Sequence, residues 1–105
     1  MSSHYIFERR GKPPIACHAT LLAAASGRGE TGPGSLKTWT DLEVYEKAGG
    51  GYIARSIGKS TVPGRDRDLF NAAEFPTLEH ALGWFHDSRV RTLLIRKLQG
   101  LKRSG

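Results

Sequence analysis

Cysteine and long apolar runs are scarce in this sequence, and its C-terminal part lacks acidic side chains. The lone cysteine, Cys17, has no second cysteine for a disulfide within the chain, which fits a reducing compartment. The longest nearly apolar stretch, residues 19–25, is far shorter than the roughly 20 residues that cross a bilayer. The N-terminal residues lack the basic and apolar regions of a secretory signal. We therefore expect a soluble cytoplasmic protein with no membrane segment.

The amount of apolar surface limits what the chain can build. It has 105 residues, of which 38% are hydrophobic, enough for one core but too few for a second. We expect a single domain over residues 1–105. Because a core of this size leaves little room for a deep active-site cavity, composition favours a binding protein over an enzyme.

Strand patterns occupy the first two thirds of the chain. Residues 5–10 are rich in β-favouring side chains and stop at a Gly-Lys-Pro-Pro turn. Residues 15–25 alternate in a way that favours a strand, although their alanine content leaves a helix open. From Trp39 to Thr61, two alternating runs flank three consecutive glycines. They predict a central hairpin, whose register the glycines leave undetermined.

Two more segments complete the predicted sheet region. Residues 26–35 contain four glycines and a proline, a composition that predicts a flexible loop because it buries too little surface to offset the entropy of ordering. A charged turn over residues 62–68 follows the hairpin, and residues 69–75 predict a short edge strand.

Helical spacing dominates the remainder. Thr77 is a candidate N-cap for a first helix, and Asp87 with Ser88 offers a second cap. The first apolar face contains Leu78, Ala81, Leu82 and Phe85, and the second contains Val90, Leu93, Leu94, Leu98 and Leu101. On one continuous helix, at about 100° per residue, these faces would differ by more than a right angle, so we expect a break near Asp87. The predicted fold is α+β: a small antiparallel sheet of three to five strands with two C-terminal helices packed on it.

The distribution of charge is the most informative feature of the sequence. Sixteen Lys and Arg against ten Asp and Glu give a formal net charge of +6, which favours contact with polyanions. Residues 88–105 contain no acidic side chain and carry six basic ones: Arg89, Arg91, Arg96, Lys97, Lys102 and Arg103. Three of the arginines are spaced by seven, which predicts a stripe along a helix at about residues 88–103. Such a stripe suits a phosphate backbone; the alternative is a solvated outer face.

Several other side chains are candidates for an interaction surface. Lys97 falls inside the second apolar stripe, where it either extends past the helix edge or borders a protein-binding surface. Trp39 and Trp84 are candidate interface anchors, although core packing is the commoner fate of tryptophan. If they share a face, Tyr45, Tyr52 and Arg55 of the hairpin would make a stacking platform for single-stranded nucleic acid.

Catalytic, metal and nucleotide motifs are weak. The run from Gly58 to Thr61 ends like a phosphate-binding loop, but the glycine required five residues earlier is replaced by Ile53. Cys17 and His18 would point to opposite faces of a strand, so they cannot pair by themselves. His80 and His86 are six residues apart, which is not a ligand spacing on a helix. We predict no catalytic residues, no metal and no cofactor.

The sequence therefore predicts a small non-enzymatic binding domain that contacts nucleic acid or another polyanion through its basic C-terminal helix. The alternative is a protein–protein interaction module, an inhibitor or adaptor of the kind carried by phages and plasmids. In that alternative, the basic surface matches an acidic surface of a host protein.

Overall fold

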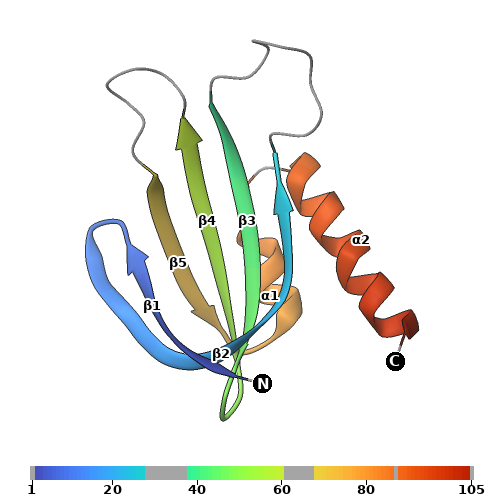
Figure 1. Ribbon diagram of the computed structural model, residues 1–105, viewed down its shortest axis with the longest axis horizontal. Helices are drawn as coiled ribbons and strands as arrows, with labels where there is room; N and C mark the ends of the chain where they lie inside the picture. Colours follow the sequence, from blue (N-terminus) through green and yellow to red (C-terminus); the bar gives the residue numbers. More distant parts are fainter. Residues whose placement is uncertain (1, 28–37, 61–67, 87, 105) are drawn as a thin grey trace.

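The structure, a computed structural model, describes residues 2–27, 38–60, 68–86 and 88–104, without the side chains of Ser88 and of residues 101–104. The described elements are β1 (Ser3–Arg9), β2 (Lys12–Ser26), β3 (Thr38–Lys47), β4 (Tyr52–Ser60), β5 (Leu69–Phe75), α1 (Leu78–Gly83) and α2 (Ser88–Ser104). The strands form one antiparallel sheet in the order β1-β2-β3-β4-β5, and the two helices pack on it (Figure 1). The predicted α+β fold is confirmed. The predicted loop at 26–35 falls mostly outside the described residues, and so do Asp87 and most of the turn at 62–68.

The start of β2 corrects one prediction. The prolines that were expected to form a turn lie inside the strand, which begins at Lys12 directly after a tight turn at Gly11. Pairing with β1 shifts register at this point, between Phe7 and Arg9, and pairing with β3 begins only at Ala19. Neither β1 nor β3 pairs with β2 at Pro13 or Pro14. The N–H groups that these prolines lack therefore cost the sheet little stability. Residues 15–25 are strand, as the alternation favours.

The register of the central hairpin is set by its glycines. Gly49, Gly50 and Gly51 all have positive φ angles of 90°, 113° and 90°, a region that other residues rarely adopt. The turn closes with a hydrogen bond from the N–H of Lys47 to the carbonyl of Gly51 at 2.9 Å. Glu46 then lies opposite Tyr52. This register decides which hairpin side chains share a face.

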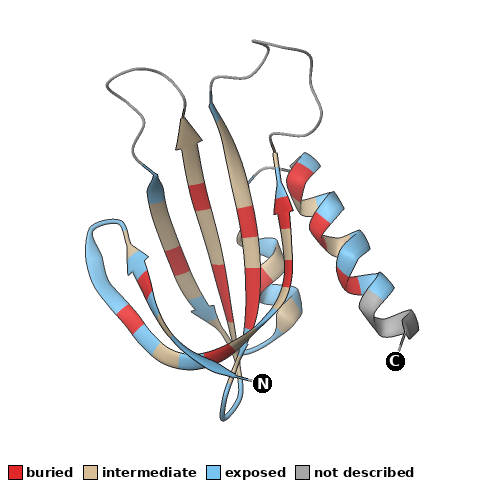
Figure 2. Cartoon of the chain, viewed as in Figure 1, coloured by how far each residue is buried: buried red, intermediate tan, exposed pale blue. Residues whose placement is uncertain are grey.

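The helices cover one face of the sheet. Its core is made of small aliphatic side chains from β2, β3 and β4, closed by Ala81 and Phe85 of the α1 region and by α2. α2 contributes Val90, Leu94 and Leu98, spaced by four so that they lie on one side of the helix. Thr77 caps α1 by accepting a hydrogen bond from the N–H of His80 at 3.2 Å, as predicted. Figure 2 shows the buried band of α2 turned toward the sheet and exposed residues along its outer side.

The other face is closed by the chain's own N-terminal strands. β1 and the first half of β2 fold across it and bring β1 into contact with β5 (Figure 1). The core beneath them contains Phe7, Ile15, Ala19, Tyr45, Ile53 and Ala72. β1 spans only the first half of β2, so among the described strands only β3 pairs with the second half of β2. α2 packs along this second half.

Two contacts hold α2 close to the sheet. A Cβ atom added at Gly27 would lie 2.8 Å from the carbonyl oxygen of Thr40 and 3.0 Å from the Cγ2 atom of Val90. A larger residue there would therefore force β3 or α2 to shift. Further along, the Lys97 ammonium donates to the carbonyl of Ala24 at 2.6 Å. Lys97 thus extends past the helix edge and satisfies a backbone carbonyl in the second half of β2.

Candidate functional site

The outer side of α2 carries exposed arginines. Arg89 and Arg96 are exposed, and so are Thr92 and Gln99 on the same side of the helix. Seven residues of α-helix span about 10 Å, so the two guanidinium groups lie two turns apart along one line. The helix continues to Ser104, which extends the line to Arg103, whose side chain, like that of Lys102, lies outside the described part.

The described carboxylates that form ion pairs do so within the sheet. Glu43 pairs with Arg55 at 2.5 Å, Asp68 with Lys59 at 2.8 Å and Glu74 with Lys47 at 3.1 Å. The hydrogen bond that the Lys59 ammonium donates to Asp68 is the largest of the causes that raise the pKa of Lys59. On α2 itself, Arg91 donates to the carbonyl of Phe85 at 3.5 Å, a long contact with a neutral group. Glu43, Asp68 and Glu74 are thus paired with cations outside α2.

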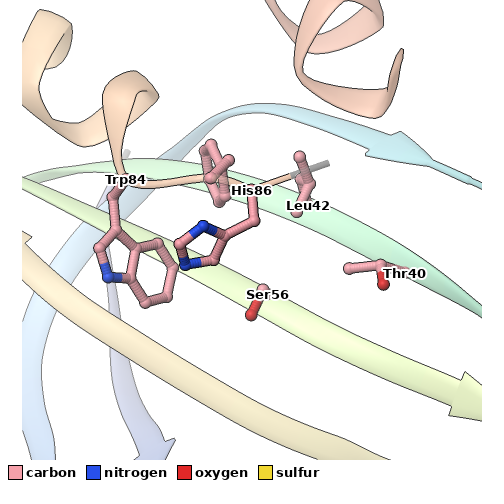
Figure 3. A pocket seen from close by; sticks show the side chains of 6 residues that line it. Thr40, Leu42, Ser56, Trp84 and His86 are labelled. Carbon is pink, nitrogen blue, oxygen red and sulfur yellow. The ribbon is translucent and has the colours of Figure 1, made fainter. Parts of the chain in front are cut away.

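A cavity of about 410 Å³ lies between the sheet and the segment that joins α1 to α2 (Figure 3). Its described lining residues are Thr40, Leu42, Ser56, Trp84, Phe85 and His86. Thr40 and Ser56 project from β3 and β4, while the rings of Trp84 and His86 extend over the sheet from the connecting segment. The lining combines rings with two hydroxyl groups.

Most residues of this cavity were not predicted from the sequence: Trp84 was a candidate for an interaction surface, but Thr40, Ser56 and His86 were not. A usable signal was present, because Thr40 alternates in phase with the buried Leu42 and Val44, at a position where an apolar side chain is expected. Ser56 stands in the same relation to Ala54 on β4. Polar residues at core-facing positions mark places that the helices leave uncovered.

The two predicted tryptophan anchors lie on different faces of the sheet. Trp84 is half-buried, with its ring centroid 6.2 Å from that of Phe75 and 5.6 Å from that of Phe85. Trp39, also half-buried, precedes the pocket residue Thr40 on β3, so its side chain points to the opposite face. The two rings therefore do not belong to one surface.

The predicted stacking platform is not formed. Tyr45 lies opposite Ile53 in the core beneath β1, while Tyr52 packs on the helix side of the sheet. Arg55 shares a face with Tyr45, but its guanidinium donates to the Glu43 carboxylate at 2.5 Å and to the Tyr45 hydroxyl at 2.8 Å. The hydroxyl in turn donates to Glu43 at 3.0 Å. The one-residue difference between hairpin registers, which the sequence left open, separates the two tyrosines.

This Arg55 cluster, made of Glu43, Tyr45 and Arg55, is neutralised internally. The Arg55 guanidinium also lies 5.4 Å from the ring centroid of Phe7 and 5.9 Å from that of Phe70. Burial, followed by the Glu43 carboxylate, raises the pKa of Tyr45 well above its ordinary value. The protonated Tyr45 hydroxyl lies between the Glu43 carboxylate and the Arg55 guanidinium, and these hydrogen bonds link β3 to β4.

Cys17 and the histidines show no catalytic arrangement in the described part of the chain. Cys17 packs beside the core beneath β1, and burial raises the pKa of its thiol, which opposes thiolate formation at neutral pH. His4 and His18 face each other on the outer side of the β1–β2 pair, with ring centroids 5.2 Å apart. His80 contacts Thr77 through Nδ1 at 2.7 Å. Among the described residues, no group of three or more metal-ligating side chains comes together.

Two broader searches complete the description. None of the described helices combines the length and the apolar character needed to cross a membrane. Comparisons with protein-family models, with curated proteins and with solved structures found no match to this chain. The surface of α2 and the cavity at its start are the features of this chain that suggest a function.

Proposed function

We propose that this chain is a non-enzymatic binding protein that contacts nucleic acid through the outer side of α2. The observation that carries the proposal is the exposed Arg96, on a helix that contains no acidic residue. Glu43, Asp68 and Glu74 pair with cations of the sheet instead. Among the described residues Arg96 forms no ion pair, and a positive charge that is not neutralised attracts an external anion.

The way α2 is attached supports the same proposal. Val90, Leu94 and Leu98 bury one side of the helix against the sheet, so the opposite side is presented in a fixed orientation. Arginines two turns apart on a rigid helix can each contact a phosphate without a large loss of conformational freedom. Each phosphate that is neutralised releases counterions, so binding weakens as salt rises.

The test compares two charge reversals of equal size. The first variant combines Arg96→Glu with Arg103→Glu on α2. The second combines Arg10→Glu with Lys12→Glu at the β1–β2 turn, which lies at the opposite side of the molecule from α2 in Figure 1. Affinity for a fluorescent oligonucleotide is measured by anisotropy over a range of salt concentrations. We expect the α2 pair to lose binding at low salt. The turn pair should keep most of its affinity and a salt slope close to that of the unmodified protein.

Two results would contradict the proposal. If both pairs weaken binding equally, only overall charge matters and α2 is not the contact surface. If the unmodified protein does not bind an oligonucleotide even at low salt, nucleic acid is not its ligand. Neutral Arg96→Gln separates charge loss from repulsion: it should reduce the slope of log affinity against log salt by about one.

An acidic protein surface is the second candidate ligand, and Leu93 favours it. This leucine is 44% exposed beside Arg96 and Lys97, and phosphate contacts leave it without a role. In this case, Leu93→Ser should weaken capture of a partner from nuclease-treated lysate and leave oligonucleotide affinity unchanged. Loss of all captured protein after nuclease treatment would reject this candidate.

A further inference from the structure

We propose that the cavity between β3, β4 and the α1–α2 connection binds one unstacked base of a single-stranded nucleic acid. The inference rests on the proposed function, because it requires that the phosphate backbone lies along α2. It adds a second site to that surface and specifies single-stranded over duplex ligands.

The lining of the cavity suits a flat, uncharged guest. None of its described lining residues is a lysine, arginine, aspartate or glutamate. Trp84 and His86 supply ring faces, and base stacking on such rings tolerates any sequence. The hydroxyls of Thr40 and Ser56 both donate and accept hydrogen bonds, as the edge of a base requires. A volume of about 410 Å³ is within the range of ligand pockets and exceeds the needs of a single ring system.

The position of the cavity connects it to the arginines. His86 lines the cavity, and α2 begins two residues later at Ser88. Arg91 reaches back from α2 to donate to the carbonyl of Phe85, another lining residue, at 3.5 Å. A base in the cavity would therefore place its own phosphate near Arg91. The next phosphates would then pass around α2 to reach Arg96, which lies about 140° from Arg91 around the helix axis.

Duplex nucleic acid does not fit this arrangement, because its bases are stacked inside the helix and reach a pocket only after unpairing. A free nucleoside or another small neutral heterocycle presents the same ring and edge chemistry. What separates these sources is the phosphate backbone, which only the polymer brings to α2.

The experiment uses three probes of equal length and one nucleoside. The probes are an oligothymidylate, an oligonucleotide of abasic sites and a duplex, all at one salt concentration, and the nucleoside is thymidine. Binding is followed by anisotropy and, in a Trp39→Phe background, by quenching of Trp84 fluorescence. We expect the oligothymidylate to bind about fivefold to 150-fold more tightly than the abasic strand, the range for one stacked base. Only the base-bearing strand should quench Trp84.

The variants fill or alter the cavity without touching the arginines. Ser56→Leu places a larger side chain in the cavity and should abolish the preference for the base-bearing strand while leaving abasic affinity unchanged. Thr40→Val, which removes a hydroxyl at nearly constant volume, should reduce the preference severalfold. Thr38→Val is its matched control, because Thr38 is exposed on the same strand, outside the described lining. If Ser56→Leu fails to fold, the Thr40 and Thr38 pair decides.

The outcomes separate the inference from the proposed function. Equal affinity for base-bearing and abasic strands would overturn the inference and leave the role of α2 intact. Thymidine that binds as tightly as the oligothymidylate would also overturn it, in favour of a small-molecule pocket. Failure of every strand to bind would reject the proposed function itself.

Discussion

The two faces of the sheet are closed by different means, and arginine has a different role on each. On the helix face, small aliphatic side chains pack beneath α1 and α2, and exposed arginines occur on the far side of α2. On the other face, Phe7 of β1 packs against Tyr45 of β3, and Arg55 is enclosed with them. The helix face thus leaves its positive charge outside, whereas the β1 face places an arginine inside and pairs it.

Arg55 and Arg96 show the difference most directly. The Arg55 side chain is 18% exposed and its guanidinium is shared between Glu43 and Tyr45. Arg96 is exposed on a helix that has no acid of its own. An enclosed guanidinium needs a partner because desolvation is costly, while an exposed one remains hydrated until a ligand arrives. Burial therefore separates structural arginine from candidate functional arginine in this protein.

The largest expected effect on stability comes from a substitution in the core of the helix face. Leu94→Ala removes a fully buried side chain from the contact between α2 and the sheet and should lower the free energy of unfolding by about 2–5 kcal/mol. The neighbouring Leu93, 44% exposed, is the matched control: Leu93→Ala should change stability by less than about 0.5 kcal/mol. Urea unfolding measures both. Equal losses of stability in the two variants would mean that Leu94 does not anchor α2 to the sheet.

The next largest effect on stability comes from removing a carboxylate from the β1 face. Glu43→Ala leaves Arg55 and the Tyr45 hydroxyl without their shared acceptor and should cost about 1–3 kcal/mol. Glu74→Ala removes a carboxylate that is 48% exposed in its pair with Lys47 and should cost less than about 1 kcal/mol. Denaturant unfolding compares the two variants. A larger loss for Glu74→Ala would show that the Arg55 cluster is not the more important pair.

The third effect is a pH dependence confined to the β1 face. The ordinary tyrosine pKa is 10.0, and that of Tyr45 is raised, so above this pH the unfolded chain loses a proton that the folded chain keeps. The unfolded state then binds fewer protons, and stability falls as pH rises, by up to about 1.4 kcal/mol per pH unit. Unfolding at about pH 9 and about pH 11 should show a steeper decline for the unmodified protein than for Tyr45→Phe. Parallel declines would contradict the enclosed hydroxyl.

The smallest effect concerns the two cations on the exposed edge of α2. Lys97→Met removes the hydrogen bond to the Ala24 carbonyl and should lower stability by less than about 1 kcal/mol. Because its ammonium is turned to the edge of β2, this change should reduce oligonucleotide affinity less than Arg96→Met does. Anisotropy on both variants tests the difference. A greater loss from Lys97→Met would place the nucleic-acid contact at the β2 edge.

Patterns in the sequence were sufficient for the order and type of most elements, although for residues 15–25 they favoured a strand and left a helix open. Alternation predicted the strands, Thr77 predicted the start of α1, and the phase difference between two apolar stripes predicted a break between the helices. These predictions hold because they depend on neighbours in sequence. The prolines at the start of β2 were misread, since only the absence of a hydrogen-bonding neighbour makes them acceptable in a strand.

By itself the sequence determined an α+β fold and a basic C-terminal helix that contains no acidic residue, because periodicity and local charge are properties of short segments. Tertiary structure alone decided that Tyr45 and Tyr52 lie on opposite faces and that Arg55 is enclosed. It alone assembled a cavity from Thr40, Ser56 and His86. Strand register and the packing of one segment over another bring residues that are far apart in the chain into contact, and no local sequence pattern predicts those contacts.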